Sequence, residues 1–288
     1  MGSADGPKQS DNWIRRILRR PLTTTLNVIG VSYYTSVTIL GAILQWTVVL
    51  PELSHALGFS LASHRALMLY LFANAMGNYL LAASSDVHLK KRKRTSFLTA
   101  NRYPMIPFRA HYCKVCDQCI RKHDHHCFIL GKCVGYNNQK YFIYCSLHTA
   151  LVSVYALLTT AMYMHVSFKT KFLGPFTFFT LLPSSMERWF FGSAGSQELL
   201  LVLFLYVCLT GAFGGLCFFT WQMFLMVMGL TTHEAINGER GTDTSIWENF
   251  TDTLGKYWLL GMLAPLPLPQ YGTGMYEGVT QLARNHSD

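Results

Sequence analysis

Charged residues are scarce in this chain, which argues against an ordinary soluble fold. Lys, Arg, Asp and Glu make up 14% of the 288 residues, against 50% hydrophobic residues, whereas soluble domains carry about 25% charged residues. Four stretches contain no charged residue at all, namely residues 26–50, 66–83, 141–168 and 199–230. Each can supply the ~20 residues that a helix needs to cross a bilayer. The sequence therefore predicts an all-α polytopic membrane protein with four transmembrane helices.

Other common signals are missing as well. The chain has no internal repeat and no low-complexity tract. No cleavable signal peptide is evident, because the first apolar run is too long for one. Gly6 occupies the position where a myristoylation signal requires Ser or Thr. Membrane attachment is therefore expected to come from the four helices themselves.

Positive charge exceeds negative charge and is unevenly distributed. The chain has 24 Lys and Arg, 15 Asp and Glu, and a net charge of +9. If the helices alternate in direction, 20 of the cations share one side with both termini, and four lie on the other. The positive-inside rule places the first side in the cytosol. Its basic run at residues 90–94 follows an apolar stretch, where such runs attract anionic membrane lipids, so lipid and not nucleic acid is the expected partner.

These patterns divide the chain into five predicted parts. Residues 1–23 form a cytosolic N-terminal lead, and residues 24–83 form a first transmembrane hairpin with helices at about 26–50 and 66–83. Residues 84–140 form a small cytosolic cysteine-rich module. A second hairpin at residues 141–230 has helices at about 141–168 and 199–230, and residues 231–288 form a cytosolic tail. Residues 51–65 and 169–197 are the expected luminal connections.

The module contains five of the eight cysteines, between Cys113 and Cys133. Because the cytosol is reducing, clustered cysteines there indicate metal ligands or catalysts, not disulfides. Cys113 and Cys116 have the spacing of a zinc knuckle, and His126 and Cys133 can close a tetrahedral site from a second hairpin. Other sets compete, and they combine Cys116 and Cys119 with His111, His123 or Cys127. Spacing alone does not decide between these sets.

The sequence Asp124-His125-His126-Cys127 also indicates a second kind of chemistry, that of a nucleophilic thiol with a neighbouring base. A nucleophilic cysteine must stay off the metal, and Cys127 is the thiol that follows an Asp-His pair. In such an arrangement Asp124 orients and charges His125, which takes the proton from Cys127. The alternative is that all of these residues are ligands of a purely structural zinc fold.

Several motifs together resemble the DHHC protein S-acyltransferases, also called palmitoyltransferases. The resemblance rests on the tetrad at residues 124–127, the Cys pair before it, Cys133-Val134-Gly135 after it, and the two flanking membrane hairpins. Thr231-Thr232-His233-Glu234 matches the family's Thr-Thr-x-Glu motif. Asn249 is similar to the Asn of its C-terminal motif. The resemblance runs from about residue 26 to residue 265.

The resemblance implies a role for each matched residue. Cys127 is the nucleophile that carries the acyl group, His125 is the base, and Asp124 is its orienting partner. Zinc is assigned to Cys113, Cys116, His126 and Cys133, and a structural motif near the active site to Thr231, Thr232, Glu234 and Asn249. The implied donor is a long-chain acyl-CoA such as palmitoyl-CoA, and the implied acceptors are cysteines of cytosolic-side protein substrates. The implied location is the endoplasmic reticulum or the Golgi.

Departures from the family pattern change the expected metal content. The family's other zinc site uses an upstream Cys pair, a His before the next Cys and one further Cys. In this chain those places fall near Thr99, Arg102 and Tyr112, and only Cys119 is left. One zinc ion is therefore expected, although His111 or His123 could rebuild a weak second site.

A further departure leaves an alternative function open. The usual Pro-Trp after the tetrad is Phe128-Ile129, so the alternative function is a catalytically weak DHHC-like membrane adaptor, or a zinc-stabilised scaffold without turnover.

The implied acyl donor leads to two expectations about binding. Moving a ~16-carbon chain into water costs about 12 kcal/mol, so the acyl tail is expected in a cavity between the helices near Cys127. The cations that could attract CoA phosphates, or simply be solvated, are Arg121, Lys122 and Lys132.

Overall fold

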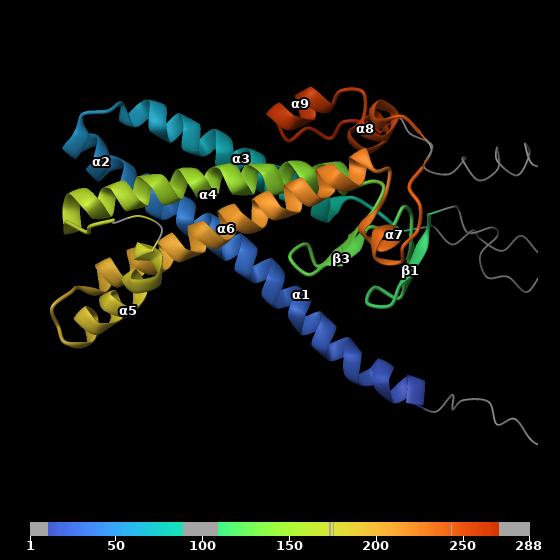
Figure 1. Cartoon of the computed structure of the whole chain (residues 1–288), viewed down its shortest axis with the longest axis horizontal. Coiled ribbons are helices and arrows are strands. Elements are labelled where there is room, and N and C mark those ends of the chain that lie inside the picture. Colours follow the sequence, from blue (N-terminus) through green and yellow to red (C-terminus); the bar gives the residue numbers. More distant parts are fainter. Residues whose placement is uncertain (1–10, 89–108, 173, 175, 243, 271–288) are drawn as a thin grey trace, which may run out of the picture.

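The computed structural model describes residues 11–88, 109–172, 174, 176–242 and 244–270 (Figure 1). Four of its helical segments are long and apolar enough to cross a membrane: Pro21–Leu57, Leu61–Ser84, Gln139–Phe168 and Ser196–Val227. They form an elongated bundle with a small cysteine-rich module at one end, between the second and third segments (Figure 1). This confirms the predicted fold class and indicates an integral membrane protein.

The first membrane segment is longer than expected. Helix α1 (Asp11–Leu44) continues through a π-helical turn, η1 (Gln45–Val49), into α2 (Leu50–Leu57). Pro51 does not end the helix, because it lies in the first turn of α2, where a missing N–H is tolerated. Gly58, with a φ of 72°, ends α2. The connection expected at residues 51–65 is thus reduced to residues 58–60, after which α3 (Leu61–Ser84) begins.

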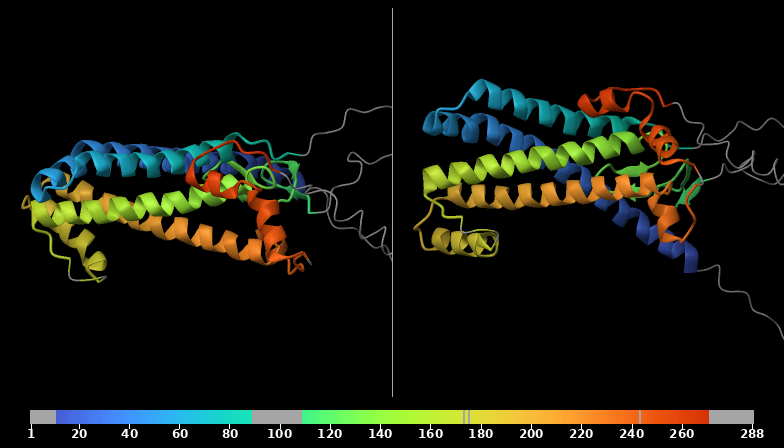
Figure 2. Two further views of the ribbon diagram at one scale, coloured as in Figure 1. Left: turned by 90° about the horizontal axis from the view of Figure 1, so that it is seen from above. Right: turned by 45° about the horizontal axis from the view of Figure 1, so that its top comes forward.

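Helix α4 (Gln139–Phe168) lies at the centre of the bundle, between α3 and α6 (Ser196–Val227) (Figure 2). Small residues bring α6 close to it. A Cβ atom on Gly215 would lie 2.8 Å from the backbone nitrogen of Ala150, and one on Gly211 would lie 2.6 Å from Ser153 Oγ. Close backbone approach is a main source of attraction between helices in lipid, so these two glycines hold the pair together.

At the far end of the bundle from the module, α5 (Thr177–Phe190) packs against α6 (Figure 2). Arg188 of α5 forms an ion pair with Glu198 in the first turn of α6. Phe179 and Phe190 are each 79% exposed. Exposed aromatic side chains next to a membrane-spanning helix are typical of the lipid–water interface.

The module consists of two short antiparallel hairpins. Strand β1 (His111–Cys113) pairs with β2 (Gln118–Ile120), and β3 (His125–Cys127) pairs with β4 (Lys132–Val134). The tail adds α7 (Thr232–Ile236), α8 (Ile246–Leu254) and α9 (Trp258–Leu263) around the same end of the bundle (Figure 1). Residues 265–270 have no regular structure, because prolines alternate at positions 265, 267 and 269.

The turn between β3 and β4 is pressed against the membrane helices. A Cβ atom on Gly30 of α1 would lie 2.5 Å from the carbonyl oxygen of Phe128. Gly131 closes the turn with a φ of 65° and faces Val31 of α1. On the other side, the Tyr79 hydroxyl of α3 donates to the Ile129 carbonyl at 2.9 Å. The hairpin that carries the Asp-His-His-Cys sequence is therefore fixed between α1 and α3 at one end of the bundle.

Candidate active site and metal centre

Strand β3 separates two chemistries by the direction of its side chains. Successive residues of a strand point to opposite faces, so His125 and Cys127 share one face and His126 points to the other. His126 lies directly across from Cys133 in the β3–β4 register. Candidate metal ligands therefore collect on one face of the hairpin, and the thiol of Cys127 lies on the other.

On the His126 face, the ligand atoms of Cys113, Cys116, His126 and Cys133 lie within 4.8 Å of one another. Cys116 Sγ is 3.3 Å from His126 Nδ1 and 3.5 Å from Cys133 Sγ, and Cys133 Sγ is 3.6 Å from the same Nδ1. A tetrahedral zinc ion with bonds of about 2.0–2.3 Å would place such ligands roughly 3.6–3.8 Å apart. The cluster therefore fits zinc, and spacing had left this set open among several.

The charges of this cluster also favour a cation. Hydrogen bonds with Cys116 and Cys133 lower the pKa of Cys113, and contacts with Cys113 and Cys116 raise the pKa of Cys133. The three sulfur atoms compete for negative charge, because each thiolate disfavours the next. A divalent cation removes that competition, since it binds all three as thiolates.

Asn27 of α1 reaches the metal cluster from the membrane side. Its Oδ1 lies 3.0 Å from His126 Nε2, and an amide oxygen can only accept, so Nε2 carries the proton and the lone pair of Nδ1 faces the sulfurs. A metal-binding histidine usually has such an outer partner on its second nitrogen. Sequence reasoning missed Asn27, whose one signal is an amide inside an apolar stretch.

Replacing Asn27 with Leu is expected to weaken zinc binding about 10–100-fold, because His126 loses the partner that fixes its tautomer. Competition of the purified protein against a chelator measures the change. Asn27→Asp retains an acceptor at the same place and should keep near-normal affinity. Equal zinc retention in the wild type and in Asn27→Leu would contradict the role given to this contact.

On the other face of the hairpin, the Asp124 carboxylate is almost completely buried, with 1% exposure. It accepts hydrogen bonds from His125 Nδ1 at 2.6 Å, Gln222 Nε2 at 2.7 Å, the Thr232 amide at 2.7 Å and the Thr232 hydroxyl at 3.1 Å. Burial opposes ionisation of Asp124, but these hydrogen bonds outweigh it and hold its pKa below the ordinary value. Asp124 is therefore a fixed negative charge beside His125.

The Asp124 carboxylate makes His125 a strong base. Burial lowers the pKa of His125, yet Asp124 and the sulfur of Cys127 together raise it to about 9. The Nδ1 atom is held by Asp124, so Nε2 is the nitrogen left to exchange a proton with Cys127. The ring of Phe142 packs edge-on against the imidazole, with centroids 5.2 Å apart.

Cys127 lies in an apolar environment and outside the metal cluster. It is 7% exposed and packs with residues of α3 and α4 that include Tyr79, Tyr141 and Cys145. The structure thus brings the predicted Asp124, His125 and Cys127 together, away from the four predicted zinc ligands.

Known proteins are similar to this chain in sequence. The description "DHHC palmitoyltransferase" belongs to a family model that matches residues 91–239. Palmitoyltransferase ZDHHC22 of Homo sapiens is 32% identical over 247 residues, which cover 84% of this chain and 93% of the relative. The chain belongs to the DHHC palmitoyltransferase family.

Other relatives agree. Palmitoyltransferase ZDHHC22 of Danio rerio is 29% identical over 266 residues, or 88% of this chain and 95% of the relative. Palmitoyltransferase ZDHHC3 of Homo sapiens is 32% identical over 179 residues, or 58% of this chain and 52% of the relative. The family resemblance found in the sequence is confirmed, and it is the divergent ZDHHC22 proteins that this chain matches over most of its length.

The family's Thr-Thr-x-Glu motif starts α7 and closes the site. Thr231 and Glu234 form a capping box, in which the Glu234 amide donates to the Thr231 hydroxyl at 3.2 Å and the Thr231 amide to the Glu234 carboxylate at 2.8 Å. This places the amide of Thr232 on Asp124. The same Glu234 accepts two hydrogen bonds from Arg109, at 2.6 and 2.7 Å. Arg109, just before β1, was not singled out by sequence reasoning.

Two further sets of hydrogen bonds support the site, one between α4 and α6 and one within the tail. Gln139 Nε2 of α4 donates to Gln222 Oε1 at 3.0 Å, which turns the Gln222 NH2 group toward Asp124. Asn249 Oδ1 accepts from the hydroxyls of Thr242 and Thr244 at 3.0 and 2.6 Å. Asn249 therefore braces the tail itself.

The cations considered for CoA phosphates are engaged within the fold. Lys122 is 5% exposed and pairs with Asp252 at 2.9 Å. Lys132 Nζ donates to the Ala83 and Ser85 carbonyls at the end of α3, at 2.8 and 2.6 Å. Arg121 stacks over the ring of Tyr136 at 4.4 Å. The basic run at residues 90–94, with Thr99 and Arg102, lies outside the described residues.

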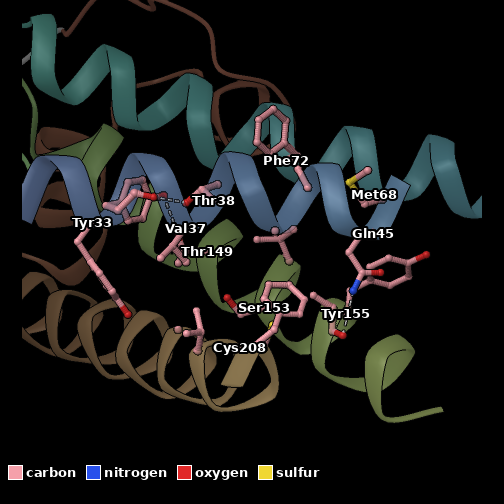
Figure 3. Close-up of a pocket in the computed structure, with 18 residues that line it drawn as sticks. Tyr33, Val37, Thr38, Gln45, Met68, Phe72, Thr149, Ser153, Tyr155 and Cys208 are labelled. Carbon is pink, nitrogen blue, oxygen red and sulfur yellow. Dashed lines mark hydrogen bonds between the residues drawn. The ribbon is translucent and has the colours of Figure 1, made fainter. Parts of the chain in front are cut away.

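A cavity lies between α1, α3, α4 and α6 (Figure 3). Its lining includes Tyr34, Val37, Phe72, Ser153 and Cys208. Tyr34 stacks on Tyr79 with centroids 4.5 Å apart, and its hydroxyl lies 3.4 Å from Cys145 Sγ. Because Tyr79 and Cys145 both pack in the cluster that contains Cys127, the cavity begins close to the thiol.

A polar side chain, Gln45, lines the cavity farther along the helices. Gln45 Nε2 donates to the Thr160 hydroxyl at 2.8 Å, and the Thr159 hydroxyl donates to Gln45 Oε1 at 3.0 Å. Along α1 the distance from Tyr34 to Gln45 is roughly 16 Å at 1.5 Å per residue. The lining residues are thus spread along the membrane helices (Figure 3), and most of the lining is apolar.

Proposed function

We propose that this chain is a protein S-acyltransferase that transfers a long-chain acyl group from acyl-CoA to cysteine residues of target proteins through an acyl-Cys127 intermediate. One observation carries the proposal: Cys127 shares a face of β3 with His125, the base charged by Asp124, while the metal-ligand cluster lies on the opposite face. Membership of the DHHC palmitoyltransferase family supports the same reaction.

The first half-reaction forms the intermediate. The sulfur of Cys127 attacks the carbonyl carbon of the acyl-CoA thioester, and its proton moves to His125 Nε2. Asp124 stabilises the imidazolium that results. The bond between the carbonyl carbon and the CoA sulfur then breaks, and His125 returns the proton to that sulfur as CoA leaves.

The second half-reaction releases the intermediate. A cysteine of the target protein attacks the carbonyl carbon of acyl-Cys127, and His125 accepts its proton. The bond to Cys127 breaks, and the proton passes from His125 to the Cys127 sulfur. The target becomes a thioester and the enzyme returns to its starting state.

Cys113, Cys116, His126 and Cys133 would hold the zinc ion. The ion, when bound, supplies the cross-link that joins the two hairpins, since a module with so few core residues depends on its metal to fold. The metal site lies apart from the reacting sulfur, because β3 turns the side chain of His126 away from that of Cys127. No residue of this cluster takes part in acyl transfer.

The cavity between the helices would hold the acyl tail. Keeping a ~16-carbon chain out of water is worth about 12 kcal/mol, and the apolar wall from Tyr34 toward Gln45 offers that environment next to Cys127. The excess of Lys and Arg in the N-terminal lead and the module supports a cytosolic active site. Family membership supports the endoplasmic reticulum or Golgi as the location, with anionic lipids at the module's surface.

Filling the middle of the cavity should shorten the chains that the enzyme prefers. Val37 lines the cavity between Tyr34 and Gln45, so Val37→Phe takes up space needed by the end of a long chain. At ~0.8 kcal/mol per CH2 group, a chain two carbons too long should be disfavoured by roughly tenfold. Competition between 12-, 14- and 16-carbon acyl-CoAs measures the shift.

Leu40 provides the matched control for this experiment. It lies on the same helix, is 64% exposed and faces away from the cavity, so Leu40→Phe should leave the chain-length preference unchanged. An unaltered preference in Val37→Phe would show that the tail lies elsewhere.

The reaction itself is tested with purified full-length protein and an alkyne-tagged palmitoyl-CoA. We expect a thioester-linked label on the chain, removed by hydroxylamine, that passes to an added cysteine-bearing acceptor. A membrane scaffold without turnover would take up no label, and a catalytically weak adaptor would be labelled without passing the label on. Family membership disfavours both alternatives.

A further inference from the structure

Three side chains that acyl transfer does not use meet beside the site of Asp124. His111 begins β1, His233 follows Thr232 in α7, and Glu239 comes just after α7. One ligand atom from each lies within 4.8 Å of the other two. The rings of His111 and His233 are stacked, with centroids 3.9 Å apart. The chain thus gathers two imidazoles and a carboxylate from two distant segments.

Three imidazole nitrogens here are buried and have no hydrogen-bond partner among the residues that the structure describes. They are Nε2 of His111 and both ring nitrogens of His123, a residue that is 7% exposed. The ring of His123 meets that of His233 edge-on at 5.5 Å, and on its other side it approaches the Cys113 sulfur. A buried polar atom without a partner costs about 1–3 kcal/mol, and such atoms often mark a place where a water or an ion belongs.

We propose that His111, His233 and Glu239 bind a second divalent metal ion of the zinc class, separate from the ion at the cysteine cluster. Two histidines and one glutamate form a ligand set that zinc uses when water fills its fourth position. Imidazole and carboxylate donors without sulfur suit zinc and its neighbours among the divalent transition metals. Glu239 is exposed, so an ion can enter from the solvent.

This site has a weaker ligand set than the cysteine cluster and should bind zinc more weakly. It offers two imidazoles and one carboxylate, whereas the cysteine cluster offers three sulfurs and one imidazole within 3.3–3.9 Å contacts. Glu239 is exposed, so part of the binding energy is spent on ordering its side chain. The second ion is therefore exchangeable.

An ion at this place would join the module to the tail. His111 belongs to the β1–β2 hairpin, and His233 belongs to the turn whose neighbour Thr232 holds Asp124. The same junction already contains the Arg109–Glu234 ion pair. The residues expected to form the family's other zinc site are missing from this sequence, and the proposed set uses different side chains to cross-link the same hairpin.

Metal counting on the full-length protein tests the proposal. Protein purified without added metal and dialysed against a mild chelator should retain about one zinc per chain, at the cysteine cluster. Titration with zinc should then show a second, weaker equivalent. His233→Gln and Glu239→Gln should each lose this second equivalent at zinc concentrations that saturate the wild type, and each should keep the first, which shows that the module is folded.

Two controls and a spectrum sharpen the result. His55→Gln in α2 and Glu187→Gln in α5 change the same residue types at exposed positions and should keep both equivalents. Cobalt in place of zinc should give thiolate-to-metal charge-transfer absorption for the first equivalent and none for the second. The proposal is overturned if the wild type takes up no second equivalent of zinc, or if either His233→Gln or Glu239→Gln retains the second equivalent. Metal counting requires no acyl transfer, so that outcome leaves the proposed reaction untouched.

Discussion

Cys127→Ser is expected to abolish the hydroxylamine-sensitive acyl label and to reduce acyl transfer at least about 10³-fold. A hydroxyl is a far weaker nucleophile than a thiol, and it would form an oxygen ester that hydroxylamine does not release under mild conditions. The exchange of sulfur for oxygen is small in volume, so the apolar cluster around Tyr79 and Tyr141 should still form. In-gel detection of the alkyne label, before and after hydroxylamine, reads out both effects.

Two measurements guard this experiment. Cys217→Ser changes an exposed cysteine of α6 and should label as the wild type does. Zinc content should stay the same in Cys127→Ser, because Cys127 is not part of the cluster formed by Cys113, Cys116, His126 and Cys133. A persistent thioester label in Cys127→Ser would move the nucleophile to another cysteine, and a loss of zinc would place Cys127 on the metal.

Asp124→Asn is expected to slow acyl transfer about 10²–10⁴-fold, the range associated with a positioned base and its orienting carboxylate. The Asp124 oxygens accept from donors on all sides, so the NH2 group of an asparagine would face the Thr232 amide or the Gln222 side chain, which are also donors. His125 would lose the negative charge that raises its pKa. Single-turnover labelling of Cys127 measures the rate of the first half-reaction.

Asp117 offers the matched control for this substitution. It lies exposed in the turn between β1 and β2 with a φ of 56°, a conformation that asparagine adopts readily. Asp117→Asn should therefore leave the labelling rate unchanged. A normal rate in Asp124→Asn, with zinc retained, would show that His125 needs no carboxylate partner.

The local part of the site was predictable from sequence, because it depends on short spacings. The order of residues 124–127 sufficed to propose a base and a thiol, and the Cys113–Cys116 pair sufficed to propose part of a zinc site. The complete ligand set followed from the family resemblance, and the structure brings these groups together. Charge-free stretches likewise indicated four membrane helices, since lipid leaves few other uses for such runs.

The long-range part was not predictable, because a single sequence does not state which distant polar group will meet a buried one. Gln222, Thr232 and Asn27 lie 98, 108 and 99 residues from their partners in the site. Gln222 and Asn27 were ordinary polar residues in the sequence, and Thr232 was placed near the active site only by the family resemblance. Only the burial of Asp124 and His126 creates the demand for a donor or an acceptor that these residues meet.

Tertiary packing also uses residues in ways that local rules do not state. The connection expected at residues 51–65 begins later, because proline fits the first turn of a helix and α2 continues to Leu57. Lys122 and Lys132 were considered for CoA phosphates or for solvent; in the structure Lys122 pairs with Asp252, and Lys132 donates to carbonyls at the end of α3.

The alternation of β3 makes the tetrad intolerant of insertion. Adding one residue between His126 and Cys127 would reverse the side on which the sulfur emerges, and a free thiol would then compete for the cation next to three others. Deleting one residue of the tetrad would likewise turn the His125 side chain away from the Asp124 carboxylate. Substitutions can thus change the rate of such an enzyme. An insertion that shifts the residues of β3 by one position would instead turn the nucleophilic sulfur into a fourth sulfur ligand of the metal.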